Sequence, residues 1–233
     1  MHRPFRTTTT TTWLVLTESR WVFFLFFCDD ETNMSGHSSV YHSVYEDRNQ
    51  LAGRGSDLSN YYYFTDGLTA AEIDTILTLG GPSKPGTVGA TTDVSYRSSE
   101  IKWVEAAPPW LYEKLARCVR KANEELWHFD VVGFGESLQI GTYSSDSKGH
   151  YDWHMDCGKR SCCRKISLTV QLTNEAEYEG GELQFFYSRK TRVAPKKKGT
   201  VVLFPSCLMH RVTPVTSGVR QSMVAWITGP PFR

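Results

Sequence analysis

Three residues with metal-binding side chains mark the centre of this sequence: His154 and Asp156, separated by one residue, and the distant His210. Alternate side chains of a strand face the same side, so we expect His154 and Asp156 to project together. Two imidazoles and one carboxylate, with no evident fourth protein ligand, form the facial triad that holds Fe(II) and leaves coordination positions open. The three residues therefore predict a non-haem iron site with room for a cosubstrate and O2.

A second charged group follows the last of these ligands. Turn-forming residues between 213 and 218 predict a hairpin centred near Val215. Such a hairpin would set Arg220 opposite His210, and directly opposed residues share a sheet face. Ser222 would face the same way. A guanidinium beside a hydroxyl near a metal suits the distal carboxylate of a dicarboxylic acid, and 2-oxoglutarate fits that description.

The sequence around these residues resembles a known family. Similar segments occur in the family's order and spacing, and the similarity extends upstream to about Tyr61. The segments that carry the resemblance are 151–156 (YDWHMD), 164–172 (RKISLTVQL), 178–183 (YEGGEL), 204–206, 210–215 and 229–233. They resemble the PKHD-type (prolyl/lysyl hydroxylase domain) Fe(II)- and 2-oxoglutarate-dependent dioxygenases, which are related to prolyl 4-hydroxylases.

The resemblance implies a role for each site residue. His154, Asp156 and His210 would be the iron ligands, and Arg220 would hold 2-oxoglutarate. Tyr143 would donate its hydroxyl to a cosubstrate carboxylate, as a tyrosine there does in related prolyl hydroxylases; otherwise it is a core aromatic residue. The implied activity is hydroxylation of a C–H bond, with a prolyl or other amino-acid side chain of a protein or peptide favoured as substrate. The implied coproducts are succinate and CO2, and the resemblance also allows ascorbate as a reductant.

Two other functions stay open beside this one. The first is a dioxygenase that acts on a small molecule or a nucleobase, and the second is a non-catalytic jelly-roll module that retains a metal. Substrate choice is expected to depend on the loops at about 83–100 and 157–165, whose sequence does not identify a substrate. The segment 97–103 also resembles one that the family has ahead of the barrel: Arg97 and Trp103 flank the substrate cleft, or Trp103 covers the sheet.

From residue 136 onward, short runs with strand character alternate with turn formers. Turn signals include 180–181, 198–199 and 217–218. Many short antiparallel strands around a buried site indicate a double-sheet jelly roll of the cupin type, the same architecture as the family's double-stranded β-helix. We therefore expect a mainly β fold with supporting α-helices. The predicted strands cover 136–143, 150–156, 166–173, 182–187, 200–205, 208–213 and 219–228.

Two helices are expected ahead of these strands. Thr69 and Glu72 form a capping box, and that helix should end near 80–81. A second helix should begin at 108–109, where proline is tolerated in the first turn. Its apolar positions recur every three or four residues and give one buried face. We expect one domain over 61–233, with helical support at about 68–128 and the jelly-roll core at about 136–233.

The first sixty residues differ from the rest. Residues 1–33 combine a threonine run with an interrupted apolar stretch and are expected to be an atypical extension, disordered or not translated. A targeting or anchor segment is the alternative, although the apolar stretch is too short to span a bilayer. Residues 34–60 are interpreted as a linker. The cysteines lack the regular spacing of a secreted disulfide scaffold, which favours a cytoplasmic location for an Fe(II) protein.

Charge predicts no strong nucleic-acid or membrane attraction, because the formal net charge of the 233 residues is +1. Basic pairs such as 164–165 would contact an anionic substrate or nucleic acid, or else lie in solvated loops, which is the commoner case. The spacing of Cys157, Cys162 and Cys163 fits no regular zinc pattern, so we expect free thiols there. The sequence does not indicate an oligomeric state.

Overall fold

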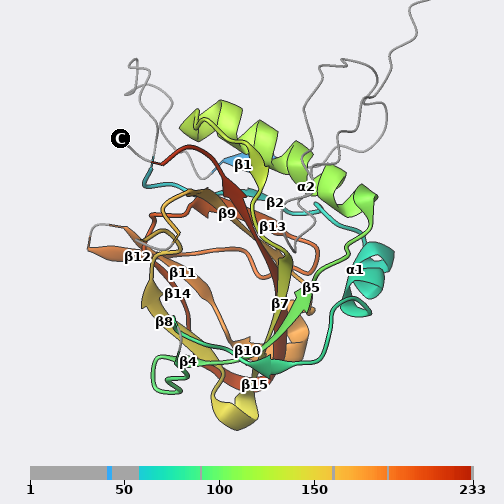
Figure 1. Ribbon diagram of the computed structural model, residues 1–233. Coiled ribbons are helices and arrows are strands. Elements are labelled where there is room, and N and C mark those ends of the chain that lie inside the picture. The colour runs from blue at the N-terminus through green and yellow to red at the C-terminus, as the bar shows by residue number, and fades with distance from the viewer. Residues whose placement is uncertain (1–40, 44–57, 90, 159–160, 188, 232–233) are drawn as a thin grey trace, which may run out of the picture.

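The core of the protein is a pair of antiparallel sheets that enclose a barrel-like interior, as the computed structural model shows (Figure 1). The structure describes residues 41–43, 58–89, 91–158, 161–187 and 189–231. This architecture confirms the predicted mainly β fold with a jelly-roll core. The large sheet runs in the order β1 (Tyr41–Ser43), β2 (Tyr62–Phe64), β13 (Val201–Pro205), β9 (Arg164–Gln171), β15 (Val215–Thr228), β7 (Leu138–Ser144), β5 (Glu100–Val104) and β3 (Lys84–Pro85), and β10 (Tyr178–Gly180) and β6 (Gly133–Phe134) also pair with β15. The small sheet runs β12 (Lys190–Val193), β11 (Leu183–Tyr187), β14 (His210–Val212), β8 (His150–His154) and β4 (Arg97–Ser98).

Two α-helices cover the outer face of the large sheet (Figure 1). Helix α1 (Ala70–Leu77) begins with the predicted capping box, in which Glu72 accepts a 2.7 Å hydrogen bond from the backbone N–H of Thr69. It ends at the C-cap Thr78, two residues before the glycine pair that was expected to end it. Helix α2 (Pro109–Ala122) begins after Pro108, as predicted, and continues into a π-helical turn, Asn123–Trp127.

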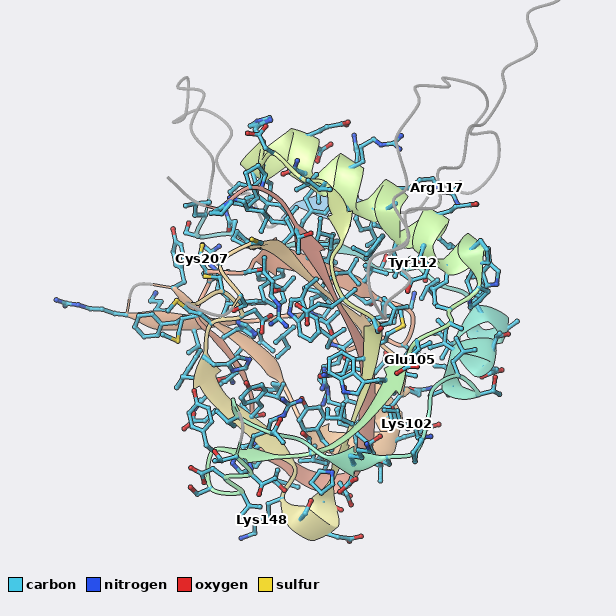
Figure 2. All side chains as sticks on the ribbon, viewed as in Figure 1. Lys102, Glu105, Tyr112, Arg117, Lys148 and Cys207 are labelled. Carbon is cyan, nitrogen blue, oxygen red and sulfur yellow. The ribbon has the colours of Figure 1, made fainter. Side chains whose placement is uncertain are left out.

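The strands of the large sheet divide their side chains between two cores. Successive residues of a strand face opposite sides, and β13 shows the division clearly. Val201 and Leu203 pack into the cluster beneath the helices, whereas Val202 and Phe204 pack into the barrel interior. Side chains fill much of the space between the two sheets (Figure 2). The helices therefore stabilise one face of the sheet and leave the other face to build a site.

The predicted hairpin between His210 and Arg220 is wrong. Strand β14 pairs with β8 and β11 in the small sheet, whereas β15 pairs with β7, β9 and β10 in the large one. The chain crosses between the sheets at Pro214, which has no N–H to donate and whose carbonyl accepts from the N–H of Gly181. Residues 217–218, expected as a turn, lie inside β15 and pair with β10.

A second difference concerns the first two predicted ligands. Strand β8 ends at His154, so Asp156 lies in the loop beyond it rather than on the same strand. Its backbone N–H donates to the carbonyl of Ser206, which replaces the missing ladder contact. Of the linker predicted at 34–60, residues 41–43 form β1 and pair with β2. The extension predicted at 1–33 lies outside the described residues. None of the helices in the described part of the chain is long and apolar enough to cross a membrane.

Candidate functional site

His154, Asp156 and His210 meet inside the barrel, although they come from a strand, a loop and a second strand. One ligand atom from each lies within 4.8 Å of the other two. The Nε2 atom of His154 is 3.8 Å from Oδ1 of Asp156, and the Nε2 atom of His210 is 3.7 Å from Oδ2. His154 and His210 are register partners across β8 and β14, which sets the two rings 4.2 Å apart. Pairing in the small sheet therefore brings the two imidazoles together.

Both histidines direct Nε2 toward the shared centre because Nδ1 is already occupied. Nδ1 of His154 lies 2.7 Å from the carbonyl oxygen of Asp152, and Nδ1 of His210 lies 2.8 Å from that of Leu208. A carbonyl only accepts hydrogen bonds, so each Nδ1 carries a proton, and in the neutral imidazole Nε2 is then the nitrogen with the free lone pair. Backbone contacts of this kind hold metal-binding histidines in one tautomer and orientation.

Burial and neighbouring charges shift the pKa values of His154 and Asp156 toward their metal-binding protonation states. Burial, followed by the nearby His210, lowers the pKa of His154 to about 3, so this imidazole is neutral at neutral pH. Burial alone would raise the pKa of Asp156, but His210, His154 and the Ser167 hydroxyl hold that pKa below its ordinary value. The Ser167 hydroxyl donates a 2.6 Å hydrogen bond to Oδ2 of Asp156. Tyr151 stacks on His154 with 3.5 Å between the ring centres.

Two neutral imidazoles and one carboxylate fit a divalent iron ion. Among the described residues, no other group of His, Cys, Asp or Glu side chains brings its ligand atoms together in this way. The donor set is nitrogen and oxygen without thiolate, and it matches the two-histidine, one-carboxylate set of non-haem Fe(II) sites. Each ligand also has a partner that fixes its orientation. These three residues could hold the metal.

Arg220 is a buried cation inside the barrel. It is only 1% exposed, and no carboxylate pairs with it among the described residues. Its guanidinium donates to Oγ of Ser222 at 3.2 Å and to Oε1 of Gln171 at 3.0 Å, while its Nε has no partner in the described structure. A buried guanidinium without a counter-ion is costly. The group is therefore poised to bind an anion.

A cavity of about 330 Å³ connects the triad with the Arg220 region. Tyr143 and Ser222 line it together with the three predicted ligands, and Ser222 links the cavity wall to Arg220. Tyr143 is the direct partner of Arg220 between β7 and β15. The structure thus brings together the six residues of the predicted site, through pairing within the two sheets and the loop of Asp156 rather than through the expected hairpin. The roles of these residues remain predictions.

Other residues singled out in the sequence fall into two groups. Arg97 and Trp103 line the cavity, and the ring centre of Trp103 is also 6.3 Å from that of Trp226. Cys157, Cys162 and Cys163 are free thiols. Figure 2 shows another free cysteine, Cys207, toward the end of the barrel away from Lys148, which follows the turn Ser145–Ser147.

Several polar residues of the site escaped the sequence analysis. Ser167, Thr169 and Gln171 alternate along β9 with Ile166, Leu168 and Val170, and all six side chains are buried. The apolar set packs beneath the helices. Polar residues at alternate positions of a strand indicate that one of its faces is polar, and here that face contributes to the site. Arg164, interpreted as part of a solvated loop, also lines the cavity.

Comparison with known proteins agrees with this geometry. Residues 138–228 match the 2OG-Fe(II) oxygenase superfamily. A PKHD-type hydroxylase of Synechococcus sp. (strain CC9311) is 30% identical over 146 residues, which cover 60% of this chain and 63% of the relative. Another, of Psychrobacter sp. (strain PRwf-1), is 45% identical over 145 residues, 59% of this chain and 56% of the relative. The chain covers 63%, 39% and 35% of the length of three such relatives.

Solved structures show the same fold. A prolyl-4-hydroxylase of Pseudomonas putida has a TM-score of 0.57 at 17% identity, over 73% of this chain and 92% of that one. A prolyl hydroxylase of Trichoplax adhaerens has a TM-score of 0.59 at 16% identity, over 73% and 84%. The matched residues 138–228 are thus similar to a superfamily that is named for Fe(II) and 2-oxoglutarate. By sequence, the chain is also similar to PKHD-type hydroxylases.

Proposed function

We propose that this protein is a dioxygenase that hydroxylates a C–H bond of a prolyl or other amino-acid side chain in a protein or peptide. The reaction would consume 2-oxoglutarate and O2 and release succinate and CO2. One observation carries the proposal: a single cavity is lined both by the triad of two imidazoles and one carboxylate and by Ser222. Ser222 accepts a hydrogen bond from Arg220, whose guanidinium has no carboxylate partner among the described residues. A module that only bound a metal would have no use for a buried anion anchor.

The chain's residues would divide the work between metal and cosubstrate. His154, Asp156 and His210 would hold Fe(II), which with 2-oxoglutarate and O2 supplies the oxidising chemistry. An imidazole binds a metal through its neutral nitrogen and Asp156 binds as a carboxylate, so the three ligands would contribute one negative charge to a divalent ion. The proposed reaction requires no side chain to act as nucleophile or general base. The protein instead positions groups and limits the access of water.

Arg220, Ser222 and Tyr143 would bind the distal carboxylate of 2-oxoglutarate. Arg220 offers Nε, which has no partner in the described structure, and Ser222 offers a hydroxyl on the cavity wall. Charge-assisted hydrogen bonds from a guanidinium are about twice as strong as neutral ones. In a buried site, the dianion would supply the counter-charge that Arg220 lacks.

The amino-acid substrate is inferred from two features. The relatives are described as PKHD-type hydroxylases, and the structural neighbours as prolyl hydroxylases. The cavity also has aromatic walls from Trp103, Trp226 and Tyr151. Aromatic walls with a few polar groups suit an apolar ring such as that of proline. A reducing cytoplasm would suit both Fe(II) and the free cysteines of the described part of the chain.

The first test is anaerobic reconstitution of the full chain with Fe(II), followed by 2-oxoglutarate. The proposal expects a visible charge-transfer absorption band that requires both additions and is lost in Asp156→Ala. Metal binding without such a band would favour the alternative function, a non-catalytic jelly-roll module that retains a metal.

The second test presents proline-containing peptides, matched peptides with alanine in place of proline, and free amino acids or nucleosides. Mass spectrometry should find one added oxygen on the proline peptides, with stoichiometric succinate. Oxygen addition to a free small molecule alone would overturn the peptide substrate while leaving the oxygenase intact.

A further inference from the structure

The carboxylate ligand Asp156 is held in place without the support of a strand. Strand β8 stops at His154, two residues earlier. The backbone N–H groups of Asp156 and Cys157 both donate to the carbonyl of Ser206, at 2.9 and 3.1 Å. The position of this ligand therefore depends on a small set of contacts across the loop, and each contact can be tested by itself.

Arg164 supplies one of these contacts from the first position of β9. Its Nη1 donates a 3.2 Å hydrogen bond to the backbone carbonyl of Asp156, which also accepts from the Ser161 hydroxyl at 2.8 Å. The other two guanidinium nitrogens, Nε and Nη2, donate to the two carboxylate oxygens of Glu136 at 2.6 Å each. All three nitrogens of the arginine are thus engaged, and one of them holds the loop of the metal ligand.

The flat face of the same guanidinium packs on a wall of the cavity. The central carbon of Arg164 lies 3.8 Å from the centre of the Trp226 ring. Glu136, Arg164 and Trp226 all line the cavity, and they come from the segment before β7, from β9 and from β15. A planar fork that binds a carboxylate with one edge, a carbonyl with another and an indole with its face is available only to arginine, because lysine offers a single point charge.

We infer that Arg164 is a positioning residue for the metal centre, fixed by Glu136 and Trp226 and acting through the backbone of Asp156. The pair is partly shielded from water, since the side chains of Arg164 and Glu136 are 18% and 33% exposed. A partly buried bidentate pair keeps its geometry better than an exposed one. The inference rests on the proposed function for the identity of the metal, but it concerns how the ligand is held rather than what the site does.

The test compares Arg164→Met with Lys121→Met in the full chain. Lys121 of α2 forms a 2.6 Å ion pair with Glu125 of the π-helical turn that follows, so its loss removes a salt bridge of similar length outside the cavity. Fe(II) affinity is measured anaerobically by competition with a chromogenic chelator, well below the unfolding temperature of each variant. We expect Arg164→Met to weaken metal binding roughly 10–100-fold, the range found when outer-shell partners of metal ligands are removed. Lys121→Met should match the wild type.

A spectroscopic readout separates positioning from general damage. Co(II) is substituted for iron, and its visible d–d absorption reports coordination geometry. The spectrum should change in Arg164→Met and stay unchanged in Lys121→Met, and Arg164→Lys should not restore it. Glu136→Gln should shift metal affinity in the same direction by a smaller factor, because Arg164 then loses an ionised partner.

The outcomes distinguish the inference from the proposed function. If Arg164→Met binds Fe(II) within twofold of wild type and keeps the Co(II) spectrum, Arg164 does not position the ligand, and only this inference fails. If the wild type binds no metal, or binds it equally well after His210→Ala, the proposed function itself fails.

Discussion

Tyr143 and Arg220 are direct partners between β7 and β15, and the guanidinium carbon of Arg220 lies 5.3 Å from the centre of the Tyr143 ring. The ring face and two hydrogen bonds, to Ser222 and Gln171, are the contacts that keep this buried cation in place. None of these groups carries a negative charge. The arrangement orients the guanidinium and leaves its charge free for an incoming anion.

Replacement of Arg220 should therefore weaken 2-oxoglutarate binding and spare the metal. Charge-assisted hydrogen bonds contribute about 1.5–3 kcal/mol, so we expect Arg220→Ala to raise the 2-oxoglutarate concentration at half-saturation by roughly 10–100-fold. Arg220→Lys should fall between, because it keeps the charge and loses the fork. The measurement is titration of the anaerobic Fe(II) complex with 2-oxoglutarate. An unchanged half-saturation point in Arg220→Ala would show that the anchor lies elsewhere.

Loss of either histidine of the triad should abolish iron retention. His154→Ala and His210→Ala each leave two of three protein ligands, and the remaining donors are too few for a stable site. The matched control is His150→Ala on the same strand as His154. The ring of His150 contacts backbone carbonyls of Lys148 and Ser95 and does not line the cavity. Iron content after desalting should be near zero in His154→Ala and His210→Ala and near wild type in His150→Ala. Full iron content in both His154→Ala and His210→Ala would contradict the ligand assignment.

The composition of the site could be predicted from sequence, whereas the route by which its residues meet could not. His154, Asp156 and His210 were recognised by residue type and motif, which need no pairing information. Arg220 was placed beside them through a predicted hairpin, but β14 and β15 lie in different sheets. The turn formers near Val215 are compatible with a crossing between sheets as well as with a hairpin. Which strands pair is decided by long-range contacts, and a local turn signal cannot report them.

Arg164 shows the same limit from another side. In the sequence it is one of two adjacent basic residues, a pattern that usually indicates a solvated loop. Its partners Glu136 and Trp226 are 28 and 62 positions away, so only the folded chain brings the three together. In contrast, the capping box of α1 was predicted correctly because its partners, Thr69 and Glu72, are three residues apart.

Gly181 should be essential for the shape of the anion anchor. It has φ of +57°, and a Cβ added there would lie 2.9 Å from Cδ of Arg220 and 3.0 Å from a methyl group of Val215. Gly181→Ala should lower the free energy of unfolding by about 1–3 kcal/mol through backbone strain and crowding. It should also raise the 2-oxoglutarate requirement, because Arg220 must shift.

Gly133 supplies the control for that substitution. Its φ is also positive, at +156°, an added Cβ meets nothing within 4 Å, and the residue does not line the cavity. Gly133→Ala should therefore show backbone strain without crowding and leave 2-oxoglutarate binding unchanged. Urea unfolding and anaerobic titration of both variants provide the comparison. Equal 2-oxoglutarate affinity in the two variants would mean that crowding at Gly181 does not reach the anchor.

Glu72 should make a pH-dependent contribution to stability far from the site. Its carboxylate accepts hydrogen bonds from Thr69 and from Nζ of Lys114 at 2.7 Å. Burial alone would raise the pKa of Glu72, but the bonds from Lys114 and Thr69 lower it below the ordinary value of 4.5. The folded state therefore holds the ionised form more tightly than the unfolded chain does. The stabilisation is complete above the ordinary pKa and is lost as pH falls through the lowered one.

Glu72→Gln should accordingly reduce the free energy of unfolding by about 1 kcal/mol at neutral pH, since it weakens a helix cap and an ion pair. The difference from wild type should shrink as the medium is acidified below the lowered pKa, because the wild-type carboxyl is then protonated as well. Glu125→Gln is the control: Glu125 and its partner Lys121 are more exposed, with side chains 39% and 47% exposed, and an exposed i,i+4 pair contributes below about 0.5 kcal/mol. Urea unfolding of the three proteins at neutral and acidic pH measures the effect. A difference that stays constant with pH would mean that the capping geometry of Glu72, and not its charge, stabilises α1.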